Sequence, residues 1–112
     1  MKTYLIKTNG EYDENFIIPK GDSQKSLDVL QKAVGGYIEV VSPHKLERTK
    51  LYVNEEGKMH DFTANVIATG INGNVIVGDV VVQTSNAMVQ QYIEKCFAIL
   101  NMHPLGHKPI NN

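Results

Sequence analysis

The stretch that decides the fold reads SLDVLQKAVGGYIEVV and spans residues 26–41. Its first half repeats apolar side chains at three- and four-residue spacing, at Leu27, Leu30 and Val34. This spacing predicts a short amphipathic helix. Ser23 or Ser26 can cap its first turn, because a serine hydroxyl accepts from the free N–H groups there.

The second half of the stretch predicts a stop followed by a strand. Gly35 and Gly36 end the helix, since glycine accepts the left-handed conformation beyond a helix C-terminus. Residues 37–41 are rich in β-branched and aromatic side chains and form a strand. The predicted strand therefore comes immediately after the glycine stop of the helix.

The preceding residues predict a β-hairpin. Residues 3–8 form one strand, and Asn9-Gly10 follows as a dipeptide that suits a tight hairpin turn. Residues 11–18 form the return strand, which Pro19-Lys20-Gly21 stops.

The residues that follow predict a loop and a second hairpin. Residues 44–50 are a polar, basic loop. Residues 51–54 and 58–62 pair around the turn Glu55-Glu56-Gly57. Residues 63–69 fit a short helix and a strand equally well.

The last third predicts a loop, a strand and a helix. Residues 70–74 form the loop, and residues 75–83 form a strand with Gly78 as a bulge or bend. Ser85 or Asn86 caps the final helix. Its apolar stripe consists of Val89, Tyr92, Ile93, Cys96, Phe97 and Leu100.

The order of elements predicts one α+β domain over residues 1–102, with residues 103–112 as a flexible tail. We expect a mainly antiparallel β-sheet. A short helix in the N-terminal half and a C-terminal amphipathic helix pack on it.

Composition excludes several classes of protein. The chain has 112 residues, 42% of them apolar, and a net charge of −1. Its apolar runs are too short to span a bilayer, and its N-terminus lacks the apolar core of a secretory signal. A single cysteine, Cys96, excludes an internal disulfide framework. We expect a protein of the cytoplasm that needs no cofactor and no membrane.

Basic residues are too few and too scattered for a DNA-binding face. Eleven Lys and Arg residues balance twelve Asp and Glu, and Arg48 is the sole arginine. DNA binding requires a dense basic surface that displaces counterions.

Catalytic and metal patterns are weak. Cys96 lies on an apolar helix stripe, and the chain has no Gly-x-Ser-x-Gly motif. His103 and His107 flank a proline and a glycine in the predicted tail, whereas zinc sites need a stiff frame. Glu55 and Glu56 are turn carboxylates, which are normally solvated. The sequence therefore favours a binding protein over an enzyme.

Two features favour the binding of a nucleotide-like ligand. Amide side chains offer a donor and an acceptor together, which suits base and ribose edges, at Asn72, Asn74, Gln83 and Asn86. The guanidinium of Arg48 suits a phosphate. The alternatives are that the amides form turns and cap the last helix, and that Arg48 lies in a solvated loop.

A family resemblance rests on residues 26–83. The pattern Leu-Gln-x-x-Val-Gly-Gly-Tyr-Ile-Glu-Val precedes Asn-Glu-Glu-Gly-Lys at residues 54–58. Asn65, Ala68-Thr69 and Gly78-Asp79 follow. In this order they resemble a family of small domains of unknown function carried by phages and mobile elements.

The layout also resembles the phage anti-Thoeris sponges, which sequester cyclic ADP-ribose signals. That resemblance implies a homodimer or higher homo-oligomer, with a ligand pocket near the subunit interface, in the host bacterial cytoplasm. The leading hypothesis is a sponge for a cyclic ADP-ribose isomer or a cyclic oligonucleotide. One alternative is a module that inhibits a host enzyme through its sheet edge or C-terminal helix, and another is an enzyme that degrades the signal.

Overall fold

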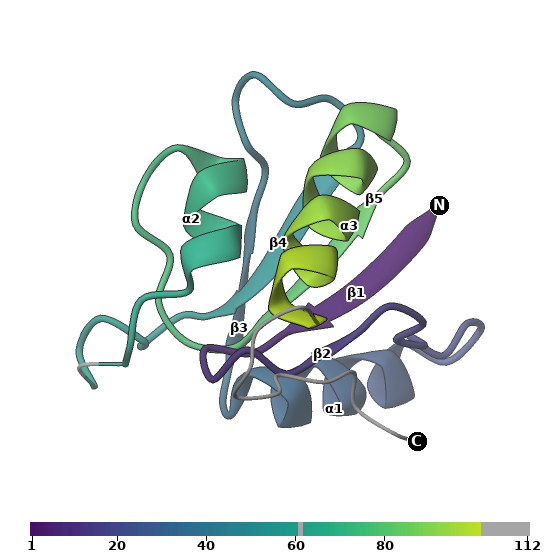
Figure 1. The fold of residues 1–112 in the computed structure, drawn as a ribbon. Helices are drawn as coiled ribbons and strands as arrows, with labels where there is room; N and C mark the ends of the chain where they lie inside the picture. Colours follow the sequence, from purple (N-terminus) through teal and green to yellow (C-terminus); the bar gives the residue numbers. More distant parts are fainter. Residues whose placement is uncertain (61, 102–112) are drawn as a thin grey trace.

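The computed structural model describes residues 1–60 and 62–101, which form a five-stranded antiparallel sheet between three helices (Figure 1). The strands are β1 (Lys2–Ile6), β2 (Tyr12–Asp13), β3 (Ile38–Val41), β4 (Thr49–Asn54) and β5 (Val80–Thr84). The helices are α1 (Ser23–Val34), α2 (Val66–Asn72) and α3 (Ala87–Asn101). This confirms the predicted α+β class with a C-terminal helix packed on the sheet. The predicted tail, residues 103–112, lies outside the described residues.

The strand order is β2-β1-β5-β4-β3, so β5 lies at the centre. Its residues Val80, Val81 and Val82 are completely buried. Because side chains alternate along a strand, Val81 faces one side of the sheet while Val80 and Val82 face the other. Both faces of the sheet are therefore covered.

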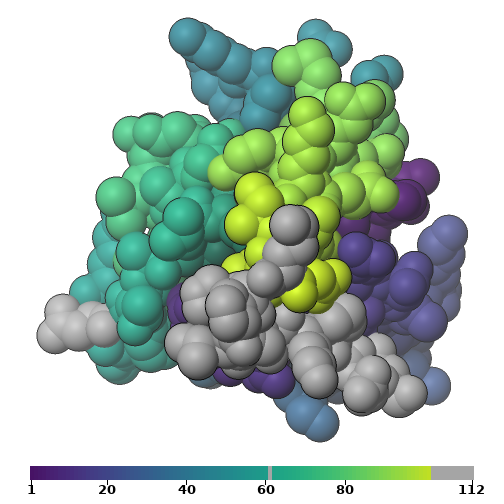
Figure 2. Space-filling model, viewed as in Figure 1, coloured from purple at the N-terminus to yellow at the C-terminus, as the bar shows by residue number. Residues whose placement is uncertain are grey.

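The helices divide between the two faces. Val81 packs with Leu5 and with Leu30 of α1 on one face. The larger core lies on the other face, where α2 and α3 contact each other (Figures 1 and 2). There Phe97 of α3 stacks on Tyr12, with ring centroids 3.7 Å apart.

The N-cap of helix α1 lies one residue before Ser23, the first of the two predicted caps. The side chain of Asp22 accepts a hydrogen bond of 3.1 Å from the N–H of Lys25, so Asp22 is the N-cap. The prediction of Ser23 or Ser26 was wrong because Ser26 instead donates its hydroxyl to the carbonyl of Pro19. Gly35 ends the helix in the left-handed conformation, with φ 79°, as predicted.

Helix α3 confirms its predicted cap. Asn86 accepts a hydrogen bond of 3.0 Å from the N–H of Met88. Val89, Ile93 and Phe97 of the predicted stripe are buried and form the core face of α3, whereas Tyr92 of the same stripe is 39% exposed. None of the helices in the described residues is long and apolar enough to cross a membrane.

The first hairpin is shorter than predicted. Strand β2 contains two residues, whereas the sequence predicted a return strand over residues 11–18. The side chain of Asp13 accepts from the N–H of Asn15 at 2.8 Å, and this local turn ends the strand.

The predicted second hairpin was wrong. Residues 58–60 form turns, and β4 pairs with β3 and β5 instead. The side chain of Asn54 accepts from the N–H of Glu56 at 2.8 Å, which closes a turn where the prediction placed a tight hairpin. The predicted loop over residues 44–50 is also too long, because β4 begins at Thr49.

Residues 63–69, which the sequence left open, contain the start of α2. Asn65 caps this helix, and Gly73 ends it with φ 85°. The predicted loop over residues 70–74 was therefore wrong for residues 70–72. The last strand is shorter than predicted, because a bend at Gly78, with φ 82°, precedes β5.

Candidate functional site

A cavity of about 850 Å³ lies between α1 and the C-terminal end of β1. We call it the α1–β1 cavity. Its lining comes from distant segments: Leu5, Lys7, Thr8, Phe16, Val29, Lys32, Ala33, Val34, Gly35, Phe62, Thr63, Gly78 and Asp79. Pockets that bind small ligands typically measure about 300–1,000 Å³. The cavity therefore has room for a nucleotide-sized molecule.

Two half-buried aromatic rings, Phe16 and Phe62, belong to the lining. Phe16 follows β2, and its N–H donates to the carbonyl of Thr3 at 3.2 Å, which ties it to β1. The N–H of Phe62 donates to the carbonyl of Gly57 at 3.0 Å. Both rings are thus carried by backbone that hydrogen bonds hold in place, and both offer flat apolar surface to a ligand.

The polar groups of the lining are charged. Lys7 at the end of β1 and exposed Lys32 on α1 supply two cations. Asp79 supplies one carboxylate, which accepts from the N–H of Thr8 at 3.0 Å. Within residues 1–60 and 62–101, neither lysine forms an ion pair with Asp79. The lining carries a formal net charge of +1 and attracts anions.

Asn65 joins the two segments that carry Lys7 and Asp79. It is 1% exposed, and its amide donates to the carbonyl of Gly78 at 3.0 Å and to that of Ile6 at 2.9 Å. Gly78 is required here for two reasons. Its φ of 82° favours glycine, and a β-carbon would lie 2.9 Å from the ring of Phe62.

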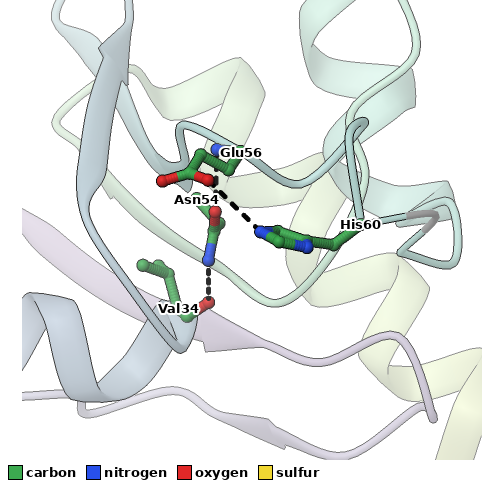
Figure 3. Close-up of polar contacts among 4 residues, drawn as sticks. All are labelled: Val34, Asn54, Glu56 and His60. Carbon is green, nitrogen blue, oxygen red and sulfur yellow. Dashed lines mark hydrogen bonds and ion pairs between the residues drawn. The ribbon is translucent and has the colours of Figure 1, made fainter.

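The far end of α1 is held by Asn54 of β4 (Figure 3). The amide nitrogen of Asn54 donates to the carbonyl of Val34 at 3.2 Å, and its oxygen accepts from the N–H of Glu56. Glu56 also lies 3.3 Å from the imidazole of His60, and the two form an ion pair when that ring is protonated (Figure 3). Asn54 thus fixes the last turn of α1, which lines the cavity.

A family model described as a domain of unknown function, DUF3846, matches residues 1–94. The chain belongs to this family. The match includes the five strands, α1, α2 and every residue that lines the α1–β1 cavity. No curated protein and no solved structure matches the chain.

The DUF3846 domain brings three of the five predicted ligand residues close together. Arg48 and Gln83 line a second cavity of about 540 Å³. Asn86 lies beside it, where its amide donates to the carbonyl of Glu47 at 3.2 Å. Arg48 has a φ of 55°, the one positive value at a non-glycine position among the described residues.

The other two predicted residues lie elsewhere. Asn72 and Asn74 line a third cavity of about 280 Å³, and the side chain of Asn72 donates to the carbonyl of Asn74 at 3.3 Å. None of the five predicted residues lines the α1–β1 cavity of the DUF3846 domain.

Sequence reasoning missed Lys7, Lys32 and Asp79. They come from the end of β1, the last turn of α1 and the segment before β5, so no single local motif contains all three. Gly78-Asp79 did belong to the pattern that suggested a family, and this was the available signal.

Metal ligands are not gathered in the described part of the DUF3846 domain. No group of three or more His, Cys, Asp or Glu side chains within residues 1–60 and 62–101 could hold a metal ion. His103 and His107, the weak metal candidates of the sequence, lie outside the described residues.

Proposed function

We propose that this protein binds a small, nucleotide-derived anion in the α1–β1 cavity. The observation that carries the proposal is the joint presence of two phenylalanine rings and two lysines in one cavity of about 850 Å³. Aromatic rings stack on nucleobases, and lysine ammonium groups bind phosphates. A ligand with an aromatic ring and a phosphate matches both parts of the lining.

We further propose that binding serves to sequester the ligand. The ligand class that the sequence suggests is a cyclic nucleotide-derived immune signal, either a cyclic ADP-ribose isomer or a cyclic oligonucleotide. Under this proposal the protein is a phage-encoded anti-defence sponge of the bacterial cytoplasm. Support for a phage-encoded protein comes from the resemblance over residues 26–83, and support for sequestration comes from the resemblance of the layout to the anti-Thoeris sponges. Lys7 and Lys32 take the phosphate role first given to Arg48.

Assembly into a homodimer or higher homo-oligomer is part of the same proposal. The α1–β1 cavity is lined by a single chain, so a second copy would enlarge or close the site without being its sole source of contacts. Light scattering at micromolar concentration measures the mass of the assembly. The mass of one chain would exclude an oligomer and leave the cavity proposal intact.

The test of ligand binding is a thermal melt with a panel of cyclic ADP-ribose isomers and cyclic di- and trinucleotides. A ligand at a hundred times its dissociation constant stabilises a protein by about 2.7 kcal/mol, which raises Tm by several degrees. Lys7→Gln removes one cation of the cavity and should reduce the rise.

Arg48→Gln is the matched control, because Arg48 lies in the second cavity. If Arg48→Gln abolishes binding and Lys7→Gln does not, the site is the second cavity. A flat Tm across the whole panel rejects the function. Chromatography of the recovered ligand separates a sponge, which returns it unchanged, from an enzyme that degrades it.

A second candidate function is a protein-binding module that uses the edge of the sheet. Strand β3 is an edge strand, Val40 on it is 49% exposed, and Tyr37 just before it is 65% exposed. An edge strand presents unpaired backbone groups to which another chain can add a strand. The apolar stripe of α3 is a core face, so β3 is the better surface. Two results together would favour this function. A host protein should bind the chain in a stoichiometric complex that Val40→Lys abolishes, and no compound of the ligand panel should bind.

A further inference from the structure

Asp79 is the one acidic side chain among the described residues that line the α1–β1 cavity. One of its carboxylate oxygens accepts from the N–H of Thr8 at 3.0 Å. Within residues 1–60 and 62–101 the other oxygen has no hydrogen-bond or ion-pair partner, although Lys7 and Lys32 line the same cavity. The carboxylate therefore has accepting capacity left at the wall of the cavity.

The backbone around Asp79 is fixed before any ligand arrives. The N–H of Gly78 donates to the carbonyl of Thr63 at 2.8 Å. The carbonyl of Gly78 accepts from the buried amide of Asn65 at 3.0 Å. With Thr8 holding the side chain as well, Asp79 is half-buried and oriented. A group that is held in place in this way needs little reorganisation on binding.

An ionised carboxylate accepts hydrogen bonds and cannot donate them. Opposite a phosphate alone it is repulsive, because both groups are negative. Opposite a hydroxyl or an amino group it forms a charge-assisted hydrogen bond. Two lysines with one carboxylate therefore suit a ligand that presents a phosphate and a hydrogen-bond donor together.

We propose that Asp79 accepts a hydrogen bond from a ribose hydroxyl or an amino group of the ligand, and that the cavity thereby selects ribosyl phosphates over phosphates without a donor. This inference rests on the proposed function, because it concerns the ligand of the same cavity. It adds the residue that determines specificity.

The test is an NMR titration of the full chain that follows the amide signals of Thr8 and Asp79. The probes are the methyl riboside of ribose 5-phosphate, which has no free anomeric hydroxyl, its 2,3-dideoxy analogue and inorganic pyrophosphate. The riboside phosphate should bind about ten-fold more tightly than the dideoxy analogue, as expected for one charge-assisted hydrogen bond. Asp79→Asn should bring that ratio close to one and tighten the binding of pyrophosphate.

Asp28→Asn is the matched control, because Asp28 lies on α1 and does not line the cavity. It should leave the ratio unchanged. Equal affinity of the wild-type chain for both sugar phosphates would overturn the role of Asp79 and leave nucleotide binding standing. No shift of either amide with any of the three probes would also overturn the role of Asp79, whereas the thermal melt panel decides the proposed function separately.

Discussion

The side-chain amide of Asn65 donates a hydrogen bond of 2.9 Å to the carbonyl oxygen of Ile6, 59 positions earlier in the chain. The same nitrogen donates to the carbonyl of Gly78, and the side-chain oxygen accepts from the N–H of Ala68. One buried side chain therefore joins the end of β1, the segment before β5 and the start of α2. The two segments that carry Lys7 and Asp79 of the α1–β1 cavity therefore depend on it.

Asn65→Ala should lower the free energy of unfolding by about 3 kcal/mol, because it removes a helix cap and the buried donor that serves the carbonyls of Ile6 and Gly78. Asn65→Asp should cost at least as much, since it places a carboxylate against those carbonyls. Urea denaturation measures both changes. If the residue were only a cap, aspartate would be tolerated. Asn74→Ala, the same change at an exposed position, is the control and should alter stability by less than about 0.5 kcal/mol.

Gly36 should tolerate no larger side chain while Asn54 is present. A β-carbon at Gly36 would lie 2.8 Å from the amide nitrogen of Asn54, and that amide is held by Val34 and Glu56. We expect Gly36→Ala to destabilise the fold by about 1–3 kcal/mol.

A double-mutant cycle separates this clash from an effect on the backbone. In an Asn54→Ala background, Gly36→Ala should cost much less, because the obstructing amide is gone. Additive effects of the two substitutions would contradict the clash.

The buried hydroxyl of Tyr4 should make the free energy of unfolding decrease at alkaline pH. Burial, followed by the negative charges of Glu94 and Glu14, raises the pKa of Tyr4 to about 12. The unfolded chain loses this proton near pH 10 and the folded chain near pH 12. The contribution of Tyr4 to the free energy of unfolding is therefore fully present below pH 10. As the pH rises towards 12 this contribution, on the order of 2 kcal/mol, is lost.

Tyr4→Phe should remove that part of the alkaline loss. At neutral pH it should leave stability unchanged or raise it by up to about 1 kcal/mol, because the buried hydroxyl has no partner among the described residues. Urea denaturation at pH 8, 10 and 11 tests both statements. Tyr37→Phe, at an exposed tyrosine, should retain the loss. Parallel pH curves for the wild-type chain and Tyr4→Phe would refute the assignment.

Local sequence signals predicted the C-terminal end of α1 and the start of α3 correctly. The pairing of strands that are distant in the sequence was predicted poorly. Gly35 and Asn86 act within one helical turn, so sequence alone identified them. The partner of β4 could not be found in this way. The prediction paired residues 51–54 with residues 58–62 across a local turn, but β4 instead pairs with β3 and with β5, which follows α2 in the chain.

The same limit applies to the site. Amides in polar loops are visible in a sequence, and Arg48 and Gln83 do line one cavity. Lys7 and Lys32 look like ordinary surface lysines until β1 and α1 are placed side by side. The two lysines line the same cavity because α1 packs on Leu5 and Val81. The spacing of residues along the chain does not predict this packing.

A substitution at Lys32 should change ligand affinity without changing stability. It is exposed on the last turn of α1 and lines the α1–β1 cavity, whereas Lys25 is exposed on the first turn of the same helix and does not. Lys32→Glu should change the free energy of unfolding without ligand by less than about 0.5 kcal/mol, as exposed substitutions do. It should weaken binding of a phosphate-bearing ligand at least ten-fold, because it replaces an attraction with a repulsion. Thermal melts with and without ligand measure both quantities, and Lys25→Glu should match the wild-type chain in the two of them. Equal losses of ligand affinity in both variants would show that net charge, and not this cavity, governs binding.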